Sequence, residues 1–367
     1  MENQTLQHYL EKGVKNTVKN IARASFKNPA ESLFLASFAK SRGQAEKART
    51  RHEGDGLHIP PFLIASITHR CNLHCTGCYA RANHLCTDDA AVQELAAADW
   101  RRLFGEARQL GVSFILLAGG EPFLRPEVLA AAAAFPDILF PVFTNGTLFK
   151  ASMLIFLKAH RNLVPVLSIE GGQAFTDDRR GPGTHARLMD AMAALKNAGI
   201  LYGASVTVTR DNQALVTSQP FLDDLESRGC AAVIFVEYVP VCAGTAALAP
   251  TSADRRALIQ ALDERRSQND RMLLIAFPGD EAASGGCLAA GRGFFHISPT
   301  GDAEPCPFSP YSDTNLRNHS LKEALASPLF RRLADSGTLT EDHNGACVLF
   351  EAEDQVRRFA AEGPALP

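Results

Sequence analysis

Three cysteines stand close together and carry the strongest chemical signal in the sequence. Cys71, Cys75 and Cys78 have the spacing C-x3-C-x2-C and directly follow an apolar run. Thiolates hold iron–sulfur clusters, and a four-iron cluster usually has four of them. Three on one loop leave one iron without a protein ligand from that loop, and an open position distinguishes a catalytic metal site from a closed structural one. The alternative is a structural zinc site completed by Cys86 or His74.

Glycines and polar residues lie at the ends of the next four apolar runs, at comparable places. They are Gly119-Gly120-Glu121-Pro122, Thr144-Asn145, Ser168 with Glu170, and Arg210. Each has an ordinary alternative, because glycine and asparagine are common in turns and an arginine after a strand is often a surface residue.

Three further cysteines, Cys287, Cys306 and Cys347, lie near the C-terminus. Two short strand candidates, 294–298 and 302–304, adjoin a Pro-Thr-Gly-Asp turn, which predicts a hairpin that brings the first two cysteines together. The alternative is that they are buried small hydrophobic residues. We prefer that interpretation for Cys230 and Cys242, which flank a predicted strand.

A regular alternation of strands and helices positions the first two groups. The predicted strands are short apolar runs, as expected for strands buried on both faces: 62–67, 112–117, 138–143, 164–169, 201–208 and 232–238. The predicted helices between and after them are 99–110, 126–135, 150–160, 184–198, 219–228 and 252–266. This order predicts an α/β fold with a parallel sheet that curls into a partial barrel, whose chemistry lies at the C-terminal ends of the strands.

Both ends of the chain depart from this alternation, so we predict three parts. Residues 1–58 are expected to be a helical extension with a polar linker at 41–58, residues 59–270 the main domain, and residues 271–367 a small cysteine-containing domain and tail. Basic residues recur at helical spacing within 1–27. They suggest either a solvated helix face or a peripheral membrane contact.

Composition narrows the setting. The net charge of −3 gives no overall electrostatic footprint for nucleic acid, and no apolar run is long enough to span a membrane. No secretory signal is evident at the N-terminus. We therefore expect a cytoplasmic protein with reduced thiols, with membrane association through residues 1–27 as the alternative.

The cysteine loop after the first strand, with Gly119–Pro122 in register after the second, resembles the radical S-adenosylmethionine (SAM) superfamily. The resemblance covers about residues 60–240. It implies a partial (β/α)6 barrel similar to a TIM barrel, a 4Fe-4S cluster on Cys71, Cys75 and Cys78, and SAM bound to the open iron. The family usually has an aromatic residue before the third cysteine. Here that residue is Gly77, and Tyr79 follows the cysteine instead.

The resemblance also implies which residues contact SAM. Gly119, Gly120, Glu121 and Pro122 would hold its amino group, since freed backbone groups and one carboxylate suit an ammonium. The remaining contacts that it implies are Thr144 and Asn145, Ser168 and Glu170 at the ribose, Arg210 at the carboxylate, and the aromatic Tyr79.

The C-terminal cysteines resemble the start of the auxiliary-cluster domains called SPASM and twitch. A full SPASM tail has seven cysteines and a twitch tail usually ends in C-x2-C, whereas here Cys347 stands alone and Phe350 takes the second position. The resemblance therefore implies at most one auxiliary cluster, on Cys287, Cys306 and Cys347. Its fourth ligand would be His343, a substrate atom or water.

The function implied is that of an oxygen-sensitive radical SAM enzyme. It would cleave SAM reductively to a 5′-deoxyadenosyl radical, with electrons from a flavodoxin or ferredoxin, and remove hydrogen from a peptide, a tetrapyrrole or other small molecule, or a lipid. The alternative is a non-catalytic iron–sulfur or zinc-binding scaffold or electron carrier, against which the Gly119–Pro122 segment argues.

Overall fold

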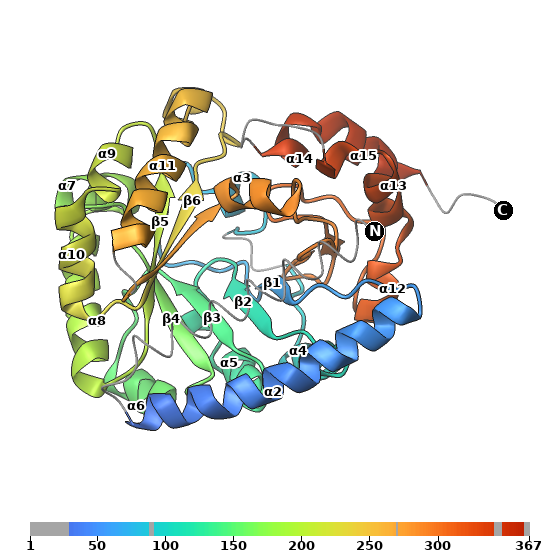
Figure 1. Cartoon of the computed structure of the whole chain (residues 1–367), viewed down its shortest axis with the longest axis horizontal. Helices are drawn as coiled ribbons and strands as arrows, with labels where there is room; N and C mark the ends of the chain where they lie inside the picture. The colour runs from blue at the N-terminus through green and yellow to red at the C-terminus, as the bar shows by residue number, and fades with distance from the viewer. Residues whose placement is uncertain (1–28, 88–91, 269–270, 341–346, 363–367) are drawn as a thin grey trace.

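A curled sheet with helices around its outer face forms the centre of the molecule (Figure 1). The computed structural model describes residues 29–87, 92–268, 271–340 and 347–362. Within these residues the sheet has nine strands in the order β7-β6-β5-β4-β3-β2-β1-β8-β9. Neighbouring strands from β1 to β7 run parallel and follow the chain order, as right-handed strand–helix–strand units produce.

The first six strands lie within a few residues of their predicted positions, because each is a short apolar run that the sheet buries on both faces. The strands are β1 (Phe62–Ser66), β2 (Phe114–Ala118), β3 (Phe140–Thr144), β4 (Leu163–Ser168), β5 (Gly203–Val208), β6 (Ala232–Glu237), β7 (Leu273–Phe277), β8 (His296–Ile297) and β9 (Ala303–Glu304).

The helices cover the outer face of the sheet and the side where it is open. They are α2 (Pro29–Gly54), α3 (Tyr79–Ala82), α4 (Ala97–Leu110), α5 (Pro126–Ala133), α6 (Ala151–Ala159), α7 (Gln173–Arg180), α8 (Thr184–Ala198), α9 (Gln213–Val216), α10 (Gln219–Arg228), α11 (Ser252–Gln268), α12 (Leu321–Leu325), α13 (Pro328–Asp335), α14 (Val348–Glu351) and α15 (Glu353–Ala361). Single 3-10 turns lie at η1 (Pro122–Leu124), η2 (Ala246–Leu248), η3 (Gly279–Ser284) and η4 (Thr338–Thr340). In Figure 1, α13 and α15 lie across the molecule from α7, α8 and α10.

The C-terminal segment is part of the same sheet. We expected the parallel array to end after six strands, but β7 extends it beside β6. At the other edge, β8 pairs in parallel with β1 and forms the predicted hairpin with β9. The composition of 271–355, rich in glycine, proline and serine, hid β7, and nothing in the sequence indicated that β8 would pair with β1. The segment therefore completes both edges of the sheet.

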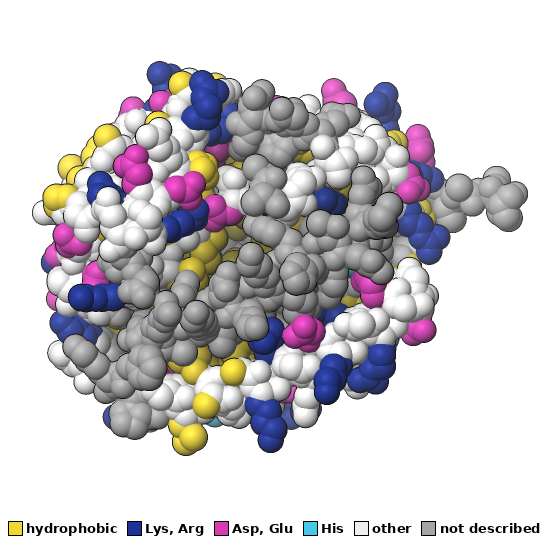
Figure 2. All heavy atoms as spheres, in the orientation of Figure 1, with side chains coloured by type: hydrophobic (Ala, Val, Ile, Leu, Met, Phe, Trp, Pro, Cys, Tyr) yellow, Lys and Arg dark blue, Asp and Glu magenta, His cyan; other side chains and the backbone are white. Residues whose placement is uncertain are grey.

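Helix α2 packs along the N-terminal edge of the strands and continues to Gly54, so most of the predicted linker at 41–58 is helical. Leu35 and Phe38 are buried against Leu139 and Val164, near the starts of β3 and β4. Arg49 is also fully buried. Lys and Arg side chains line the outer side of this helix (Figure 2). The basic residues of 1–27 lie outside the described residues, and no helix described is long and apolar enough to cross a membrane.

Candidate functional site

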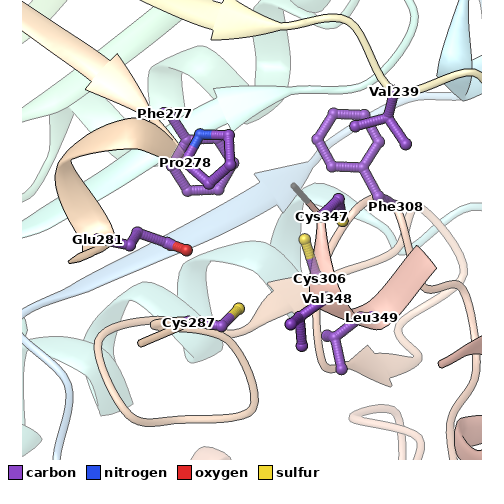
Figure 3. A pocket seen from close by; sticks show the side chains of 10 residues that line it. All are labelled: Val239, Phe277, Pro278, Glu281, Cys287, Cys306, Phe308, Cys347, Val348 and Leu349. Carbon is purple, nitrogen blue, oxygen red and sulfur yellow. The ribbon is translucent and has the colours of Figure 1, made fainter. Parts of the chain in front are cut away.

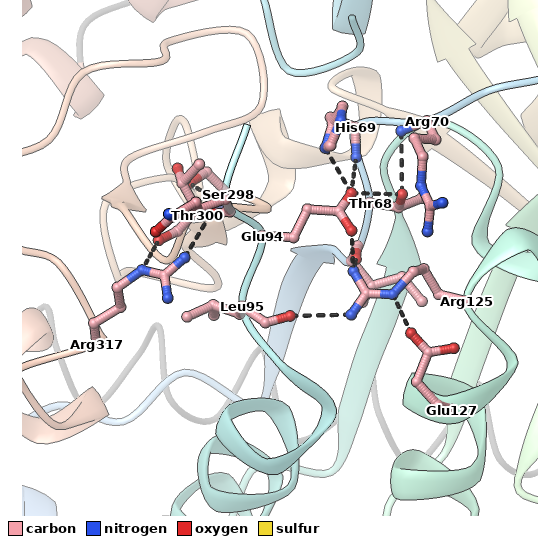
Figure 4. A network of polar contacts seen from close by, with 12 residues as sticks. Thr68, His69, Arg70, Glu94, Leu95, Arg125, Glu127, Ser298, Thr300 and Arg317 are labelled. Atoms are coloured by element: carbon pink, nitrogen blue, oxygen red, sulfur yellow. Dashed lines mark hydrogen bonds and ion pairs between the residues drawn. The ribbon is translucent and has the colours of Figure 1, made fainter. Parts of the chain in front are cut away.

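The base of the cysteine loop is fixed by a polar network (Figure 4). Glu94 accepts hydrogen bonds from Thr68 Oγ1 at 2.7 Å and from the backbone N–H of His69 at 2.8 Å. The buried Arg125 forms an ion pair with Glu94 and donates to the carbonyl of Ile67 at 3.1 Å. These bonds hold the chain as it leaves β1, so the loop that carries the cysteines starts from a rigid base.

The loop places Cys71, Cys75 and Cys78 half-buried at the C-terminal end of the sheet. A hydrogen bond from the thiol of Cys86 lowers the pKa of Cys71, and the nearby charges of Arg81 and Arg180 act in the same direction. Burial raises the pKa of Cys75, although the charge of Arg180 opposes this. Positive charge beside the loop suits a group of thiolates, whose negative charges would otherwise repel one another.

The segment after β2 lies directly against this loop. Gly120 N donates to the carbonyl of Thr68 at 2.7 Å, and Glu121 N donates to the carbonyl of Arg70 at 2.8 Å. A Cβ at Gly120 would overlap the Arg70 carbonyl, and one at Gly119, where φ is +122°, would overlap the Thr68 carbonyl. The two glycines are therefore required by the close approach of the two backbones.

Glu121 joins the loops after β2 and β3. Its carboxylate is buried and accepts hydrogen bonds from Thr144 Oγ1 at 2.7 Å, from Asn145 N at 2.8 Å and from Phe123 N at 3.2 Å. Burial raises the pKa of Glu121 to about 7, against the opposing effect of these bonds. The Asn145 side chain reaches back to the cysteine loop, where its Nδ2 donates to Asn72 Oδ1 at 2.9 Å. Pro122 is buried at the first position of η1.

A second polar group forms after β4, where Ser168 ends the strand half-buried. Glu170 is buried and accepts from Arg179 at 2.6 Å, from Arg180 at 2.7 Å and from Thr207 N at 3.1 Å. The carbonyl of Arg179 in turn accepts from the backbone N–H of Thr76, between the second and third cysteines. The end of α7 thus lies against the cysteine loop.

Arg210 lies outside this group. Its side chain is half exposed and pairs with Asp254 at 3.6 Å. The structure therefore brings Glu170 close to the cysteine loop through Arg179 and Arg180, and leaves Arg210 on the surface.

Two aromatic residues flank the third cysteine. The ring of Tyr79 packs on Phe308, with ring centroids 4.9 Å apart. At Gly77, where φ is +67°, a Cβ would overlap the hydroxyl of Tyr238 at the end of β6. That hydroxyl is buried without a hydrogen-bond partner. The ring of Tyr238 therefore fills the space beside the position at which the family usually has an aromatic residue.

The C-terminal cysteines share one cavity (Figure 3). Cys287, Cys306 and Cys347 line it together with the carboxylate of Glu281. The other lining residues are apolar: Val239, Phe277, Pro278, Phe308, Val348 and Leu349. Burial raises the pKa of Glu281 to about 7. His343 lies outside the described residues.

The cysteine groups differ from a site for a single ion. Among the described residues, no three Cys, His, Asp or Glu side chains converge as ligands of one metal ion. A four-iron cluster makes a different demand, because each thiolate binds a separate iron. In the loop, Cys86 is buried beside Cys71, whereas His74 is exposed.

Sequence reasoning missed Arg179, Arg180, Tyr238 and Glu281. The adjacent arginines after the fourth strand were a visible signal, because such a pair at the C-terminal edge of a parallel sheet can meet anionic groups. Tyr238 gave no signal of spacing, since Gly77 lies far from it in the chain. Glu281 lies six residues before Cys287, but this spacing matches no motif, and the other two cysteines of the cavity reach it only through the fold.

Similar proteins share both the sequence pattern and the fold. The model of the radical SAM superfamily matches residues 65–212. An AdoMet-dependent heme synthase of Methanosarcina barkeri is 26% identical over 337 residues, which cover 83% of this chain and 93% of the relative. A PqqA peptide cyclase of Ruegeria pomeroyi is 30% identical over 268 residues, which cover 67% of each. The structure of Streptococcus suis SuiB bound to S-adenosylmethionine matches with a TM-score of 0.62 and 18% identity over 84% of this chain and 74% of SuiB. This likeness confirms the partial barrel.

Proposed function

The chain belongs to the radical SAM superfamily, and we propose that Cys71, Cys75 and Cys78 hold the 4Fe-4S cluster of this enzyme while the loops after β2, β3 and β4 hold SAM. When bound, the reduced cluster and SAM together supply a 5′-deoxyadenosyl radical, which removes a hydrogen atom from the substrate. The alternative of a non-catalytic scaffold fits the comparisons less well, because these relatives are named as a synthase and a cyclase.

The observation that carries this proposal is the docking of Gly119–Glu121 on the cysteine loop. It holds the backbone after β2 against the segment that leads into the three cysteines. We propose that backbone carbonyls of the segment after β2 accept the ammonium of SAM. The Glu121 carboxylate is already engaged by three donors, so we assign it the positioning of Thr144 and Asn145.

The second polar group completes the proposed SAM site. We propose that Ser168 contacts the ribose of SAM, and that Glu170 positions Arg179 and Arg180, which donate to its carboxylate. Burial raises the pKa of Cys75, but Arg179 and Arg180 lie close enough for their charges to act against this rise. Their position makes them better candidates for the SAM carboxylate than the half-exposed Arg210. Tyr79 lies between the two cysteine sites, against Phe308.

The test is cleavage of SAM by the anaerobically reconstituted chain, reduced by dithionite or by a flavodoxin. The wild-type chain should form 5′-deoxyadenosine, and Cys75→Ala should form none. Cys230→Ala is the matched control, because this cysteine is buried away from the loop and donates to the carbonyl of Ala232. Continued cleavage by Cys75→Ala would sink the assignment.

For the substrate we propose an organic small molecule of the tetrapyrrole class. The match to the heme synthase spans 93% of that relative and 83% of this chain, so it extends into the C-terminal segment. A peptide is the second candidate, supported by the identity to the peptide cyclase. Formation of 5′-deoxyadenosine should rise when a porphyrin with propionate side chains is added. If 5′-deoxyadenosine formation rises with peptides and not with the porphyrin, a peptide becomes the first substrate candidate.

We also propose one auxiliary cluster on Cys287, Cys306 and Cys347, within the segment 271–367. Its support is the shared buried cavity. About eight irons and eight sulfides per chain are expected, and about four of each would reject a second cluster. Contact of residues 1–27 with a membrane remains a proposal, to be tested by vesicle flotation of the full chain and of a chain starting at residue 29.

A further inference from the structure

The C-terminal cavity contains a buried carboxylate, that of Glu281. Glu281 is 3% exposed, and its Oε1 atom has no hydrogen-bond partner. Apart from the three cysteines, the side chains that line the cavity with it are apolar. Hydrogen bonds with the backbone N–H of Leu288 and with Cys287 act to lower the pKa of this carboxyl group, but they leave Oε1 unsatisfied. A buried carboxylate that is only partly hydrogen-bonded is costly, and such groups in native proteins are normally paired, fully hydrogen-bonded or bound to a metal.

The position of Glu281 is fixed by its backbone. Its N–H donates to the carbonyl of Pro278 at 2.8 Å, and its carbonyl accepts from Ser284 Oγ at 2.6 Å. Cys287, six residues later, is held by its N–H bond to the carbonyl of Leu339 at 2.7 Å. The carboxylate is therefore directed into the cavity by an ordered turn, and Figure 3 shows it facing the sulfur atoms.

The chain offers no fourth cysteine at this cavity among the described residues. The residue that stands where a C-x2-C pair would have its second cysteine is Phe350, which does not line the cavity. Its neighbours Val348 and Leu349 do line it, with apolar side chains. Within the described part of the chain, Glu281 is the one other lining side chain with a metal-binding atom, and it comes from a different element, η3.

We propose that Glu281 is the fourth protein ligand of the auxiliary iron–sulfur cluster, opposite Cys287, Cys306 and Cys347. Three thiolates and one carboxylate then bind the four irons. One iron has oxygen in place of sulfur as its protein ligand, and binding releases the thiol protons. This inference rests on the proposed auxiliary cluster and is independent of SAM cleavage at the other site.

The consequence for the chemistry is specific. A cluster with four protein ligands is closed, as in structural sites, and suits electron transfer. A carboxylate is a harder ligand than a thiolate and is more easily exchanged at iron. Exchange of the carboxylate would then free a coordination position at one iron of the cluster, the iron bound by Glu281.

The experiment isolates this site in the full-length chain. A parent with Cys71, Cys75 and Cys78 all changed to Ala leaves the C-terminal cysteines as the one proposed cluster site, and it is reconstituted anaerobically with 57Fe and sulfide. Glu281→Ala, Glu281→Gln and Glu281→Cys are made in this parent. The control is Glu237→Gln, a carboxylate buried near Cys347 that already has Arg255 as its partner. Circular dichroism checks that each variant is folded. If Glu281→Ala does not fold, the near-isosteric Glu281→Gln is used in its place.

The readouts are iron and sulfide counts, Mössbauer spectra, and the rate of iron loss to a chelator. The parent should hold about four irons, with one distinct from the other three in the Mössbauer spectrum. In Glu281→Ala and Glu281→Gln that iron should leave at least about tenfold faster, with a three-iron EPR signal after mild oxidation. Glu281→Cys should keep four irons and lose the distinct spectrum. The Glu237→Gln control should match the parent.

The outcomes separate the claims. If Glu281→Ala and Glu281→Gln match the parent in spectrum and iron loss, Glu281 is not a ligand although the cluster stands. If the parent holds no iron and sulfide, or holds zinc, the auxiliary cluster and the role of Glu281 fail together. Neither result affects SAM cleavage by the cysteine loop, which the wild-type chain reports separately.

Discussion

Replacing Gly120 by Ala tests whether the segment after β2 must lie directly against the cysteine loop. The new Cβ would overlap the carbonyl of Arg70 and approach the backbone nitrogen of Cys71, and neither group can rotate away. The φ angle of Gly120 is not left-handed, so the cost is steric. The segment has to move, which strains or breaks the bonds from Gly120 N to Thr68 and from Glu121 N to Arg70.

The size of the effect follows from these contacts. Two backbone hydrogen bonds at roughly 0.5–1.5 kcal/mol each predict a loss of about 1–3 kcal/mol in the free energy of unfolding. The activity should fall further, because a displacement of about 1 Å at a reacting site can cost on the order of a hundredfold in rate. SAM cleavage should therefore drop about a hundredfold in a variant that remains folded at 25 °C.

The assay pairs urea unfolding with the rate of 5′-deoxyadenosine formation at saturating SAM. Gly172→Ala is the matched control, since a Cβ there has nothing within 4 Å and both properties should stay near the wild-type values. If Gly120→Ala keeps the stability and the cleavage rate of this control, the two backbones do not need their close approach. The proposed SAM site would then lose its main support.

Three further predictions concern the loop and its supports. Gly77→Ala should lower the free energy of unfolding by about 1–2 kcal/mol because of its left-handed φ, and further because the new Cβ overlaps Tyr238. Adding Tyr238→Leu should restore part of the lost melting temperature. Equal melting temperatures for the single and the double variant would contradict the contact between Gly77 and Tyr238. In Glu94, burial favours a higher pKa, but hydrogen bonds and the Arg125 charge lower the net pKa. The wild-type chain should therefore have a higher free energy of unfolding than Glu94→Gln at pH 7, and this difference should shrink below about pH 4.3. A difference that grows on acidification would refute the role of Glu94. Arg49→Met should lower the free energy of unfolding by about 2–3 kcal/mol, because the fully buried guanidinium donates to the carbonyl of Gly111 and to Ser113 Oγ at 3.1 Å. An unchanged urea midpoint would show that these hydrogen bonds do not hold α2 in place.

Local pattern was sufficient for the barrel and for the cysteine loop. Six strands were visible because a strand buried on both faces is an apolar run whatever its neighbours are. Cys71, Cys75 and Cys78 were visible because all of them come from one short loop. Gly119 and Gly120 were visible as a motif, but the reason for them, contact with Thr68 and Arg70, involves a separation of about fifty residues.

Predictions from the sequence pattern were wrong or missing in segments whose composition is typical of loops although the folded chain packs them as helix or strand. The stretch 41–58 is polar, which suggested a linker, yet its Ala, Lys, Gln, Glu and Arg residues are good helix formers and only a narrow face of α2 is buried. The strand β7 is an apolar run like the others, but its surroundings resemble loops. Glu281 is one carboxylate in such a segment, and only the fold places it among three cysteines.

The two cysteine sites are joined by the sheet, so we expect the order of the first site to depend on the C-terminal segment. β8 covers the free edge of β1, and its His296 side chain bonds Ser66 Oγ at 2.8 Å and Glu304 at 2.6 Å. Ser66 is the last residue of the strand that leads into the cysteine loop. On the far side of the loop, Asn83 donates to the carbonyl of Pro307 at 3.0 Å. A chain ending at residue 270 would lose both supports, so it should lose the order of the first site as well as the second.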